Sequence, residues 1–466
     1  MSRVSLAVPA AVGAIFGAAS TRLPGGDPDL YWHLVAGRDT LAHGLARVDV
    51  YSWTVAGRSV SVDQWLGQVL WALAANAADW RGIVALRALA VAALVALVVY
   101  GARRERPARP LVAVLVALPA IALSRFVWTE RPELFGFVCF AALIVLVRAS
   151  RDGSDRALVA LPVLMLVWSN LHGSFALGAA LILGVAIEGA LAEPARRGRY
   201  ALAALASLLL TLATPAGLGA WTMPSYHFLH PPREIQEWSL PDVTTLPGLI
   251  FALALFATFA SALFGRSRVL RDGVVLLPVL FISLTATRQL PLFPIAAAPY
   301  LAQVGPDALA ALIRRIGLRV PSFGSDGRPP TRRADGIVIG GALVALALAG
   351  VTGTNAPEQA ALPAAALTSL RSGPGLFDQY DWGGFLIYSA PGTPVFVDGR
   401  LTPYLPDVIA DYTTVLGVHP GWREVLARRG VRQLLVRPTD PIAVRARDLG
   451  WVVRARSDVF VLFDVP

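Results

Sequence analysis

Residues 26–66 read GDPDLYWHLVAGRDTLAHGLARVDVYSWTVAGRSVSVDQWL, which is the longest polar interruption in the first half of an otherwise apolar chain. Two carboxylates, Asp27 and Asp29, flank Pro28 at its start. His33 follows Asp29 by four residues, so both side chains would share one face of a helix over residues 30–43. Five aromatic rings are interleaved with the polar residues: Tyr31, Trp32, Tyr51, Trp53 and Trp65. A plain connecting loop does not need this composition.

The whole chain has the composition of an α-helical protein that crosses a membrane several times. Of its 466 residues, 55% are hydrophobic and only 15% are charged, and the mean hydropathy is +0.58. A soluble chain could not bury this much apolar surface. Arginine supplies all of the basic charge behind the net +10. Most arginines lie in short loops between apolar runs, as in the positive-inside pattern, and this argues against nucleic acid as a partner.

Long apolar runs predict about eleven transmembrane helices. Several runs are shorter than the ~20 residues that a full span needs, so these helices would extend into flanking polar residues. Residues 62–80 have aspartates at both ends and three tryptophans, which fits a helix at the membrane interface. The predicted spans are 4–20, 82–101, 110–124, 134–149, 157–169, 171–191, 200–214, 245–264, 273–286, 290–304 and 336–353.

The distribution of arginine predicts the orientation of these helices. With Arg3 and five arginine-rich loops in the cytoplasm, eleven crossings alternate consistently and residues 355–466 lie outside. Every loop that is then assigned to the outside is polar, so we expect any chemistry on the outer face. The five arginine-rich loops are 102–109, 148–156, 195–199, 266–271 and 314–333.

The composition changes after the last apolar run. We expect residues 1–354 to form the transmembrane domain, with 21–81 as its first outer loop and juxtamembrane helices. Residues 355–370 are rich in Ala and Pro and are predicted to be a linker, and 371–466 are predicted to fold as a small extracytoplasmic α/β domain. Strands are expected in FLIYSA, TPVFVDGR, RQLLVRP and WVVRARSDVFVLFDV, and helix over 406–429.

The two carboxylates of the first outer loop are the leading candidates for catalysis. Asp27 or Asp29 could act as a general base, and Asp29 could share a divalent metal ion, Mg²⁺ or Mn²⁺, with His33. The structural alternative is a turn made by Gly25, Gly26 and Pro28, with Asp29 as the N-cap of the following helix.

Other polar residues lie at predicted outer ends of helices. Arg131 and Arg288 could bind phosphate oxygens, or they could belong to an interfacial ion-pair network. An outer Arg288 breaks the positive-inside trend, so a lipid phosphate or Glu130 should compensate its charge. His172, between two apolar runs, must face protein or a water-filled cavity, where a hydrogen bond between helices is the structural alternative.

Two further regions carry polar residues. The loop 215–244 contains His227, His230 and Glu234 without the spacing of a zinc site, and an amphipathic lid over an outer-leaflet cavity fits it equally well. In the C-terminal segment, Asp381 and Asp398 stand next to glycines, which favours a structural role in turns.

Taken together, the chain resembles the C-type (GT-C) membrane glycosyltransferases. An acidic motif in the first outer loop, polar outer loops, about eleven helices and a C-terminal outer domain are typical of that class. More narrowly, the chain resembles a group of largely uncharacterised bacterial members. The motifs that carry this likeness are DPDLYWHLVAGR, VDVYSWT, WSNLHGSF, TPAG, RQLPLF, YDWGGFLI and VFVDGR.

The resemblance implies a reaction and its partners. The donor would be a sugar on a polyprenyl phosphate, and the acceptor an envelope glycan or protein at the outer face of the bacterial inner membrane. Asp29 or Asp27 would be the base towards the acceptor hydroxyl, sometimes with a metal. Arg288, Arg131 or His172 would stabilise the charge that grows on the leaving phosphate. Membrane lipids are the remaining expected partners.

The alternative function is a non-catalytic membrane protein, either a lipid or polymer transporter or an assembly partner of an envelope polysaccharide system. Polar residues within the spans would favour transport, whereas here they gather at the outer ends. The chain has no recognisable acceptor motif and no extended acidic-aromatic signature of the oligosaccharyltransferase kind, so the sequence leaves the acceptor open.

Overall fold

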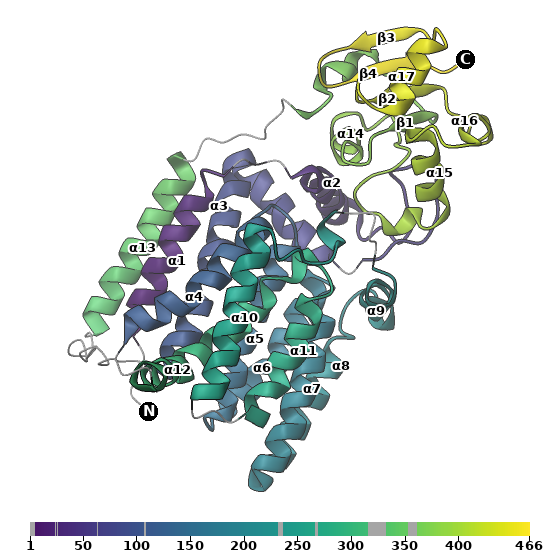
Figure 1. The fold of residues 1–466 in the computed structure, drawn as a ribbon. Helices are drawn as coiled ribbons and strands as arrows, with labels where there is room; N and C mark the ends of the chain where they lie inside the picture. Colours follow the sequence, from purple (N-terminus) through teal and green to yellow (C-terminus); the bar gives the residue numbers. More distant parts are fainter. Residues whose placement is uncertain are drawn as a thin grey trace. The chain divides into compact units, whose positions relative to one another are not determined.

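A computed structural model describes residues 5–23, 25, 27–62, 64–106, 109–231, 236–265, 269–315, 332–352 and 361–466. The chain forms two compact units (Figure 1). The helical unit contains Met1–Arg22 and Val84–Thr354. The mixed unit contains Leu23–Ile83 and Asn355–Pro466. The second unit therefore joins the first polar loop to the C-terminal segment, although more than 270 residues separate them along the chain.

The helical unit is a bundle in which every predicted apolar run is found as a helix. In Figure 1 these helices lie side by side, with α1 against α13, α5 against α6 and α10 against α12. The short helix α9 (Thr222–Leu229) lies in the predicted lid loop. The long helices are α1 (Ala7–Ser20), α3 (Trp65–Glu105), α4 (Pro110–Ser124), α5 (Glu133–Arg151), α6 (Asp155–Leu171), α7 (Phe175–Ala192), α8 (Arg197–Leu210), α10 (Leu246–Phe264), α11 (Val269–Ser283), α12 (Leu292–Arg315) and α13 (Arg332–Thr352).

The lengths and composition of the helices identify a membrane protein. Within the described ranges, five helices are long and apolar enough to cross a membrane: Trp65–Glu105, Pro110–Val127, Glu133–Arg151, Phe175–Ala192 and Leu246–Phe264. Two shorter apolar helices cover Ala7–Ser20 and Asp335–Gly350. The number of about eleven spans stays a prediction. The arginine-rich loop at 314–333 lies largely outside the described residues.

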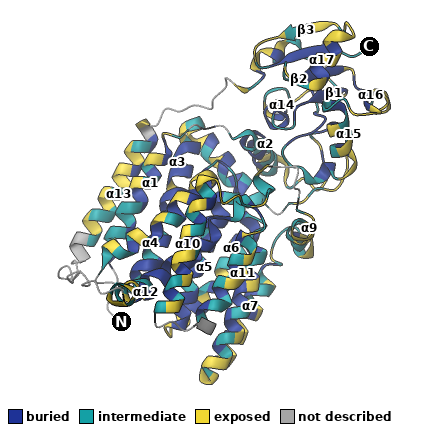
Figure 2. Ribbon diagram, viewed as in Figure 1, coloured by how far each residue is buried: buried dark blue, intermediate teal, exposed yellow. Residues whose placement is uncertain are grey.

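Helix α10 illustrates how the bundle meets its surroundings. Its buried face carries small or polar residues and the ring of Phe251. The opposite face is exposed and entirely apolar, as expected where a helix faces lipid (Figure 2). The exposed large apolar residues of α10 are Leu246, Leu249, Leu253, Phe256, Phe259 and Leu263.

Close packing in the bundle depends on small residues. On α1, Gly13 and Gly17 lie one turn apart and face α3. A Cβ at Gly17 would lie 2.6 Å from the carbonyl oxygen of Ala88, and one at Gly13 would lie 2.5 Å from that of Ala92. The two helix backbones can therefore approach as they do in other small-residue membrane contacts.

The mixed unit contains a four-stranded sheet in the order β1-β2-β4-β3. Strands β1 (Leu376–Asp378) and β2 (Gln433–Val436) are parallel, whereas β4 (Val461–Asp464) is antiparallel to both β2 and β3 (Val453–Arg456). The helices of this unit are α2 (Pro28–His43), the first part of α3, α14 (Gly383–Ser389), α15 (Asp407–Leu416), α16 (Trp422–Arg429) and α17 (Pro441–Asp448).

The first polar loop and the C-terminal segment share one core in this unit. Tyr31 and Trp32 of α2 are buried in a cluster with Trp382 and Phe385. Elsewhere, the indole of Trp53 donates a hydrogen bond of 3.0 Å to the carbonyl oxygen of Leu376. The aromatic residues of the first polar loop therefore form a hydrophobic core together with the C-terminal segment.

Several local predictions for the C-terminal segment were wrong. FLIYSA does not form a strand, because its residues 385–389 belong to α14. Gly384 lets α14 pack closely against α2, since a Cβ at Gly384 would lie 2.7 Å from the carbonyl oxygen of Pro28. TPVFVDGR forms only an isolated bridge between Val395 and Ser52.

The expected helix over 406–429 is divided into α15 and α16, and Gly421 before α16 has a φ of 90°. RQLLVRP and the last predicted segment do contain strands β2, β3 and β4. Part of the predicted linker lies outside the described residues.

Helix α3 joins the two units. From residue 65 onward, the ambiguous segment 62–80 forms its first part, and a kink at Ala78 and Asp79 separates this part from the predicted span. Asp79 has a φ of 49° and breaks the helical geometry there.

Candidate functional site

The helical unit contains an ion-paired group that we call the arginine cluster: Arg131, Glu133, Glu237, Trp238 and Arg288. Arg288 lies in a 3-10 turn, Thr287–Gln289, between α11 and α12. Its Nη2 is 2.7 Å from Oε1 of Glu133, and its Nη1 is 2.7 Å from Oε1 of Glu237. Its guanidinium carbon lies 4.9 Å from the centroid of the Trp238 ring. The guanidinium fork is therefore held between two carboxylates over an aromatic face.

Glu237 links the two arginines of the cluster. Its second carboxylate oxygen lies 3.5 Å from Nη1 of Arg131. Its side chain is 34% exposed, whereas those of Arg288 and Glu133 are 14% and 12% exposed. Burial alone would lower the pKa of Arg288, but the charges of Glu133 and Glu237 outweigh burial and raise this pKa above its ordinary value. Arg288 is therefore cationic, and Glu237 is its more accessible partner.

Secondary structure positions the members of the cluster. Glu133 is the first residue of α5, where a carboxylate is favoured by the helix dipole. The 3-10 turn of Arg288 is tied to the segment of Glu237 because the Thr287 amide and hydroxyl both donate to the carbonyl oxygen of Ser239, at 2.9 and 3.1 Å.

His172 lies beside this cluster, at the C-terminal end of α6. It interacts electrostatically with Glu133. Its Nδ1 accepts a hydrogen bond of 3.2 Å from the Ser174 amide and lies 2.9 Å from the Ser174 hydroxyl. A Cβ at Gly136 would lie 3.1 Å from this Nδ1, so a glycine makes room for the ring against α5. The structure thus brings together the three residues that were predicted to bind phosphate: Arg288, Arg131 and His172.

The carboxylates that pair with Arg288 are Glu133 and Glu237, whereas the sequence suggested Glu130. Glu130 was one of the groups expected to compensate Arg288, beside a lipid phosphate, but it forms an ion pair with Arg87, and both side chains are only 1% exposed. Arg87 also donates to the carbonyl oxygen of Ser20, at 2.8 Å. Glu130 is therefore part of the bundle's interior, and the partners of Arg288 are Glu133 and Glu237.

The predicted lid residues lie on and after α9. The rings of Tyr226 and His230 are stacked, with centroids 5.0 Å apart. The ring of His227 is 5.3 Å from that of Trp238, which connects α9 with the arginine cluster. Glu234 lies outside the described residues.

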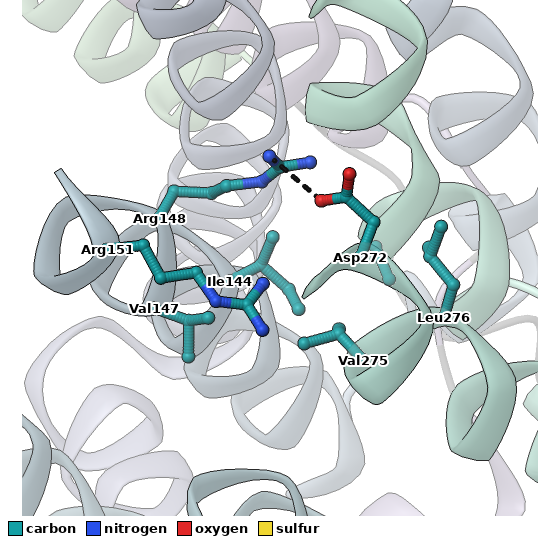
Figure 3. Close-up of a pocket in the computed structure, with 8 residues that line it drawn as sticks. Ile144, Val147, Arg148, Arg151, Asp272, Val275 and Leu276 are labelled. Atoms are coloured by element: carbon teal, nitrogen blue, oxygen red, sulfur yellow. Dashed lines mark ion pairs between the residues drawn. The ribbon is translucent and has the colours of Figure 1, made fainter. Parts of the chain in front are cut away.

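A small cavity at the other end of α5 is unrelated to this cluster (Figure 3). Arg148 and Arg151 point into it from α5, and Nη1 of Arg148 is 3.3 Å from Oδ1 of Asp272 on α11. Arg151 is paired with Glu188 at 3.1 Å. Because the carboxylate partners, Asp272 and Glu188, are only 7% and 18% exposed, less than Glu237, we assign this cavity a structural role.

In the mixed unit, the two carboxylates of the first loop have different surroundings. Asp27 is the N-cap of α2: its carboxylate accepts a hydrogen bond of 3.0 Å from the Asp29 amide, and Pro28 occupies the first helical turn. In the structural alternative, the N-cap of this helix is therefore Asp27 and not Asp29. Asp29 lies in the first turn, and its carboxylate rests on the backbone of Gly399, where a Cβ would lie 2.8 Å from its Cγ.

His33 is buried one turn beyond Asp29, with only 2% of its surface exposed. Its ring lies 3.6 Å from that of Trp32, and its Nδ1 is 3.4 Å from the amide nitrogen of Gln68. Among the residues that the structure describes, no three His, Cys, Asp or Glu side chains gather into a possible metal site. The divalent ion expected at Asp29 and His33 therefore gains no support from the described residues, and it stays a prediction.

A second arginine, Arg400, lies next to Gly399. It is ion-paired with Asp49 and with Asp398, whose carboxylate lies 2.6 Å from Nη2. Tyr404 accepts a hydrogen bond of 2.8 Å from the same nitrogen, and Tyr51 lies under the guanidinium, 5.1 Å away. Burial would lower the pKa of Arg400, but Asp398, Tyr404 and Asp49 raise it well above its ordinary value.

Comparisons with solved structures identify the fold. No family model matches the sequence, and no curated protein matches it either. An archaeal oligosaccharyltransferase, AglB from Archaeoglobus fulgidus, in complex with an inhibitory peptide and a dolichol-phosphate, is similar over 91% of this chain and 68% of its own, with a TM-score of 0.52 and 13% identity. The apo form of the oligosaccharyltransferase from the same organism gives a TM-score of 0.55 at 11% identity, over 91% and 69% of the two chains.

ArnT from Cupriavidus metallidurans, bound to undecaprenyl phosphate, is similar over 98% of this chain and 96% of its own. The TM-score is 0.54 and the identity 16%. At these identities the likeness concerns the fold alone. The chain has the GT-C fold of membrane glycosyltransferases, as its sequence resemblance predicted.

Proposed function

We propose that this GT-C chain transfers a sugar from a polyprenyl-phosphate donor to an envelope acceptor at the outer face of the bacterial inner membrane. The N-terminus would be cytoplasmic and residues 355–466 extracytoplasmic. The observation that carries the proposal is the arginine cluster, in which one guanidinium fork is oriented by two carboxylates. Two fold neighbours hold a polyprenyl-type phosphate, dolichol phosphate or undecaprenyl phosphate, which supports this donor class.

The donor phosphate is assigned to Arg288 and Arg131. A phosphate offers an arginine the same pair of oxygen acceptors as a carboxylate. If the donor replaces the Glu237 carboxylate, its oxygens meet both arginines, because Glu237 now contacts both. Glu133 and Trp238 would keep the Arg288 fork in place, and His172 adds a polar group beside Glu133.

The base is assigned to Asp29. Asp27 is occupied as a helix cap, whereas Asp29 follows it in the first turn of α2. In the reaction, the acceptor hydroxyl loses its proton to Asp29 as its oxygen forms a bond to the anomeric carbon. The bond between that carbon and the phosphate oxygen breaks, and its electron pair leaves with the phosphate. A single displacement of this kind inverts the anomeric centre.

The test is Asp29→Asn in the full-length protein, purified in lipid nanodiscs. The substrate is a lipid extract of host membranes that contains polyprenyl-linked sugars, and the readout is the release of polyprenyl phosphate on addition of envelope material. Loss of general-base catalysis should lower this release by ~10²–10⁴. Binding of undecaprenyl phosphate should not change, because the assigned phosphate ligands remain.

Two control variants make this result specific. Asp458→Asn changes an exposed aspartate of the mixed unit and should leave release unchanged. Asp27→Asn keeps a capping side chain, since Asn caps about as well as Asp. If Asp27→Asn abolishes release while Asp29→Asn does not, the base is Asp27. Wild-type release in both variants would mean that neither carboxylate is the base. Absence of release by the unchanged protein would favour the non-catalytic alternative, a lipid transporter or an assembly partner.

A further inference from the structure

We infer that Gly399 is a positioning residue for Asp29, and that the turn Asp398-Gly399-Arg400 of the C-terminal segment sets the position of the proposed base. This inference rests on the proposed function, because it concerns how Asp29 performs it. Both residues belong to the mixed unit.

The first argument is the space at Gly399. A Cβ there would overlap Oδ1 of Asp29 and would lie 2.8 Å from its Cγ and 3.4 Å from its Oδ2. The carboxylate thus occupies the volume that any other residue's side chain would fill. The backbone of Gly399 is not in the left-handed region that favours glycine. Space for Asp29, rather than backbone conformation, is therefore the reason for a glycine at this position.

The second argument is that the turn around Gly399 is held in place from both sides. The buried carboxylate of Asp398 accepts hydrogen bonds of 2.9 Å and 2.8 Å from the amide and Nε of Arg400. Arg400 is in turn ion-paired with the buried Asp49. The Tyr380 hydroxyl donates a hydrogen bond of 3.1 Å to the carbonyl oxygen of Gly399 itself. With the turn anchored in this way, an added Cβ would move the Asp29 side chain rather than the backbone.

A comparison with Gly384, another glycine of the C-terminal segment, supports the inference that Gly399 positions Asp29. A Cβ at Gly384 would lie 2.7 Å from the carbonyl oxygen of Pro28, so it would collide with the backbone of α2. A side chain at 384 is therefore expected to disturb the packing of α2. At 399 the three nearest atoms all belong to the Asp29 side chain, so the fold can accept an alanine by displacing the carboxylate.

The experiment is a double-mutant cycle of Gly399→Ala and Asp29→Asn in the full-length protein, with the same release assay. Gly399→Ala should lower the release of polyprenyl phosphate by about 10²-fold, as expected for a catalytic group displaced by ~1 Å. On the Asp29→Asn background, Gly399→Ala should cause no further loss, because a residue that acts only through Asp29 has nothing left to position. Binding of undecaprenyl phosphate and the unfolding temperature should match the wild type.

Gly392→Ala is the matched control. A Cβ at this glycine of the same segment would lie 3.9 Å from the Ser372 hydroxyl oxygen, and it would meet no closer atom of the described residues. It should keep wild-type release. If Gly399→Ala instead lowers the unfolding temperature, Asp29→Ala should restore it in the double variant, since removing the carboxylate makes room for the new methyl group. Failure of that rescue would overturn the inference.

The remaining outcomes separate the two proposals. Full release by Asp29→Asn contradicts the assignment of the base and removes the basis of the inference. Loss of release in Asp29→Asn with full release in Gly399→Ala leaves the base intact and refutes the positioning role of Gly399. Additive losses in the double variant would show general structural damage and refute it as well.

Discussion

Both units of the molecule contain an arginine held by two carboxylates over an aromatic ring, and the arrangements at Arg400 and Arg288 differ in how far water can reach them. Arg400 in the mixed unit is held by Asp49 and Asp398, whose side chains are 0% exposed. Arg288 in the helical unit is held by Glu133 and by Glu237, and Glu237 is one-third exposed. An arginine between two carboxylates can therefore stabilise the fold where both partners are buried, or be proposed to bind an anion where one partner is exposed.

The difference lies in what each carboxylate does besides pairing with its arginine. Asp49 also accepts hydrogen bonds of 2.9 and 2.6 Å from the Ser52 amide and hydroxyl, and Asp398 accepts one from Tyr404. Exchange of either for a ligand would leave several buried polar groups without partners, which is costly. Glu237 lies on a short 3-10 turn, and we propose that it leaves Arg288 when a phosphate binds, with Glu133 still in place. Arg400 is thus suited to hold the fold, and Arg288 to bind an exchangeable anion.

The largest effect that tests this contrast is expected for Arg400→Leu. Removing one partner of a buried ion pair leaves uncompensated charge and costs ~3–5 kcal/mol. The free energy of unfolding, measured by denaturant titration in detergent, should fall by that amount. In Arg437→Leu, which removes a 41% exposed partner of Asp381 in the same unit, the change should stay within ~0–1 kcal/mol. Equal effects of the two variants would contradict a structural role for Arg400.

A smaller effect, on binding rather than folding, is expected for Arg288→Lys. Lysine keeps the charge but loses the fork, and a hydrogen bond to a charged group contributes ~1.5–3 kcal/mol. Undecaprenyl phosphate in nanodiscs should therefore bind about tenfold or more weakly, while the unfolding temperature changes little.

The control for this variant is Arg196→Lys. Arg196 is also 14% exposed, is paired with Asp155 and Glu193, and lies 5.2 Å from the Tyr200 ring. It has no assigned phosphate, so lysine there should leave binding unchanged. Similar losses in both variants would return Arg288 to a purely structural role.

The sequence predicted the helices well because the length of an apolar run is a local property. The run 110–124 coincides with α4, and the run 134–149 lies within α5, Glu133–Arg151. FLIYSA was misjudged because its β-branched and aromatic residues favour a strand, whereas its helix depends on the approach of α2 to Gly384. Strand β1 has only three residues, too few for a periodic pattern.

The partners in the candidate site could not be predicted from local patterns. Arg288 is 155 residues from Glu133 and 51 from Glu237, so no spacing rule connects them. Trp53 and Leu376, which join the first loop to the C-terminal segment, are 323 residues apart. Residue chemistry selected Arg288, Arg131 and Asp29 as candidates, but only the tertiary fold identifies Asp27 as the cap and Gly399 as the neighbour of Asp29.

The smallest effect, and the one that most directly tests an exchangeable partner, is expected for Glu237→Gln. Glutamine keeps the shape of the side chain but removes the negative charge that competes with a phosphate at Arg288 and Arg131. A partly exposed ion pair is worth ~0–1 kcal/mol, so affinity for undecaprenyl phosphate should rise by up to about fivefold. The gain should shrink as salt is added, because salt screens the charge of the wild-type Glu237. Glu193→Gln, which removes a 37% exposed partner of Arg196, should leave affinity unchanged. Weaker binding in Glu237→Gln would mean that Glu237 orients the arginines for the phosphate instead of giving way to it.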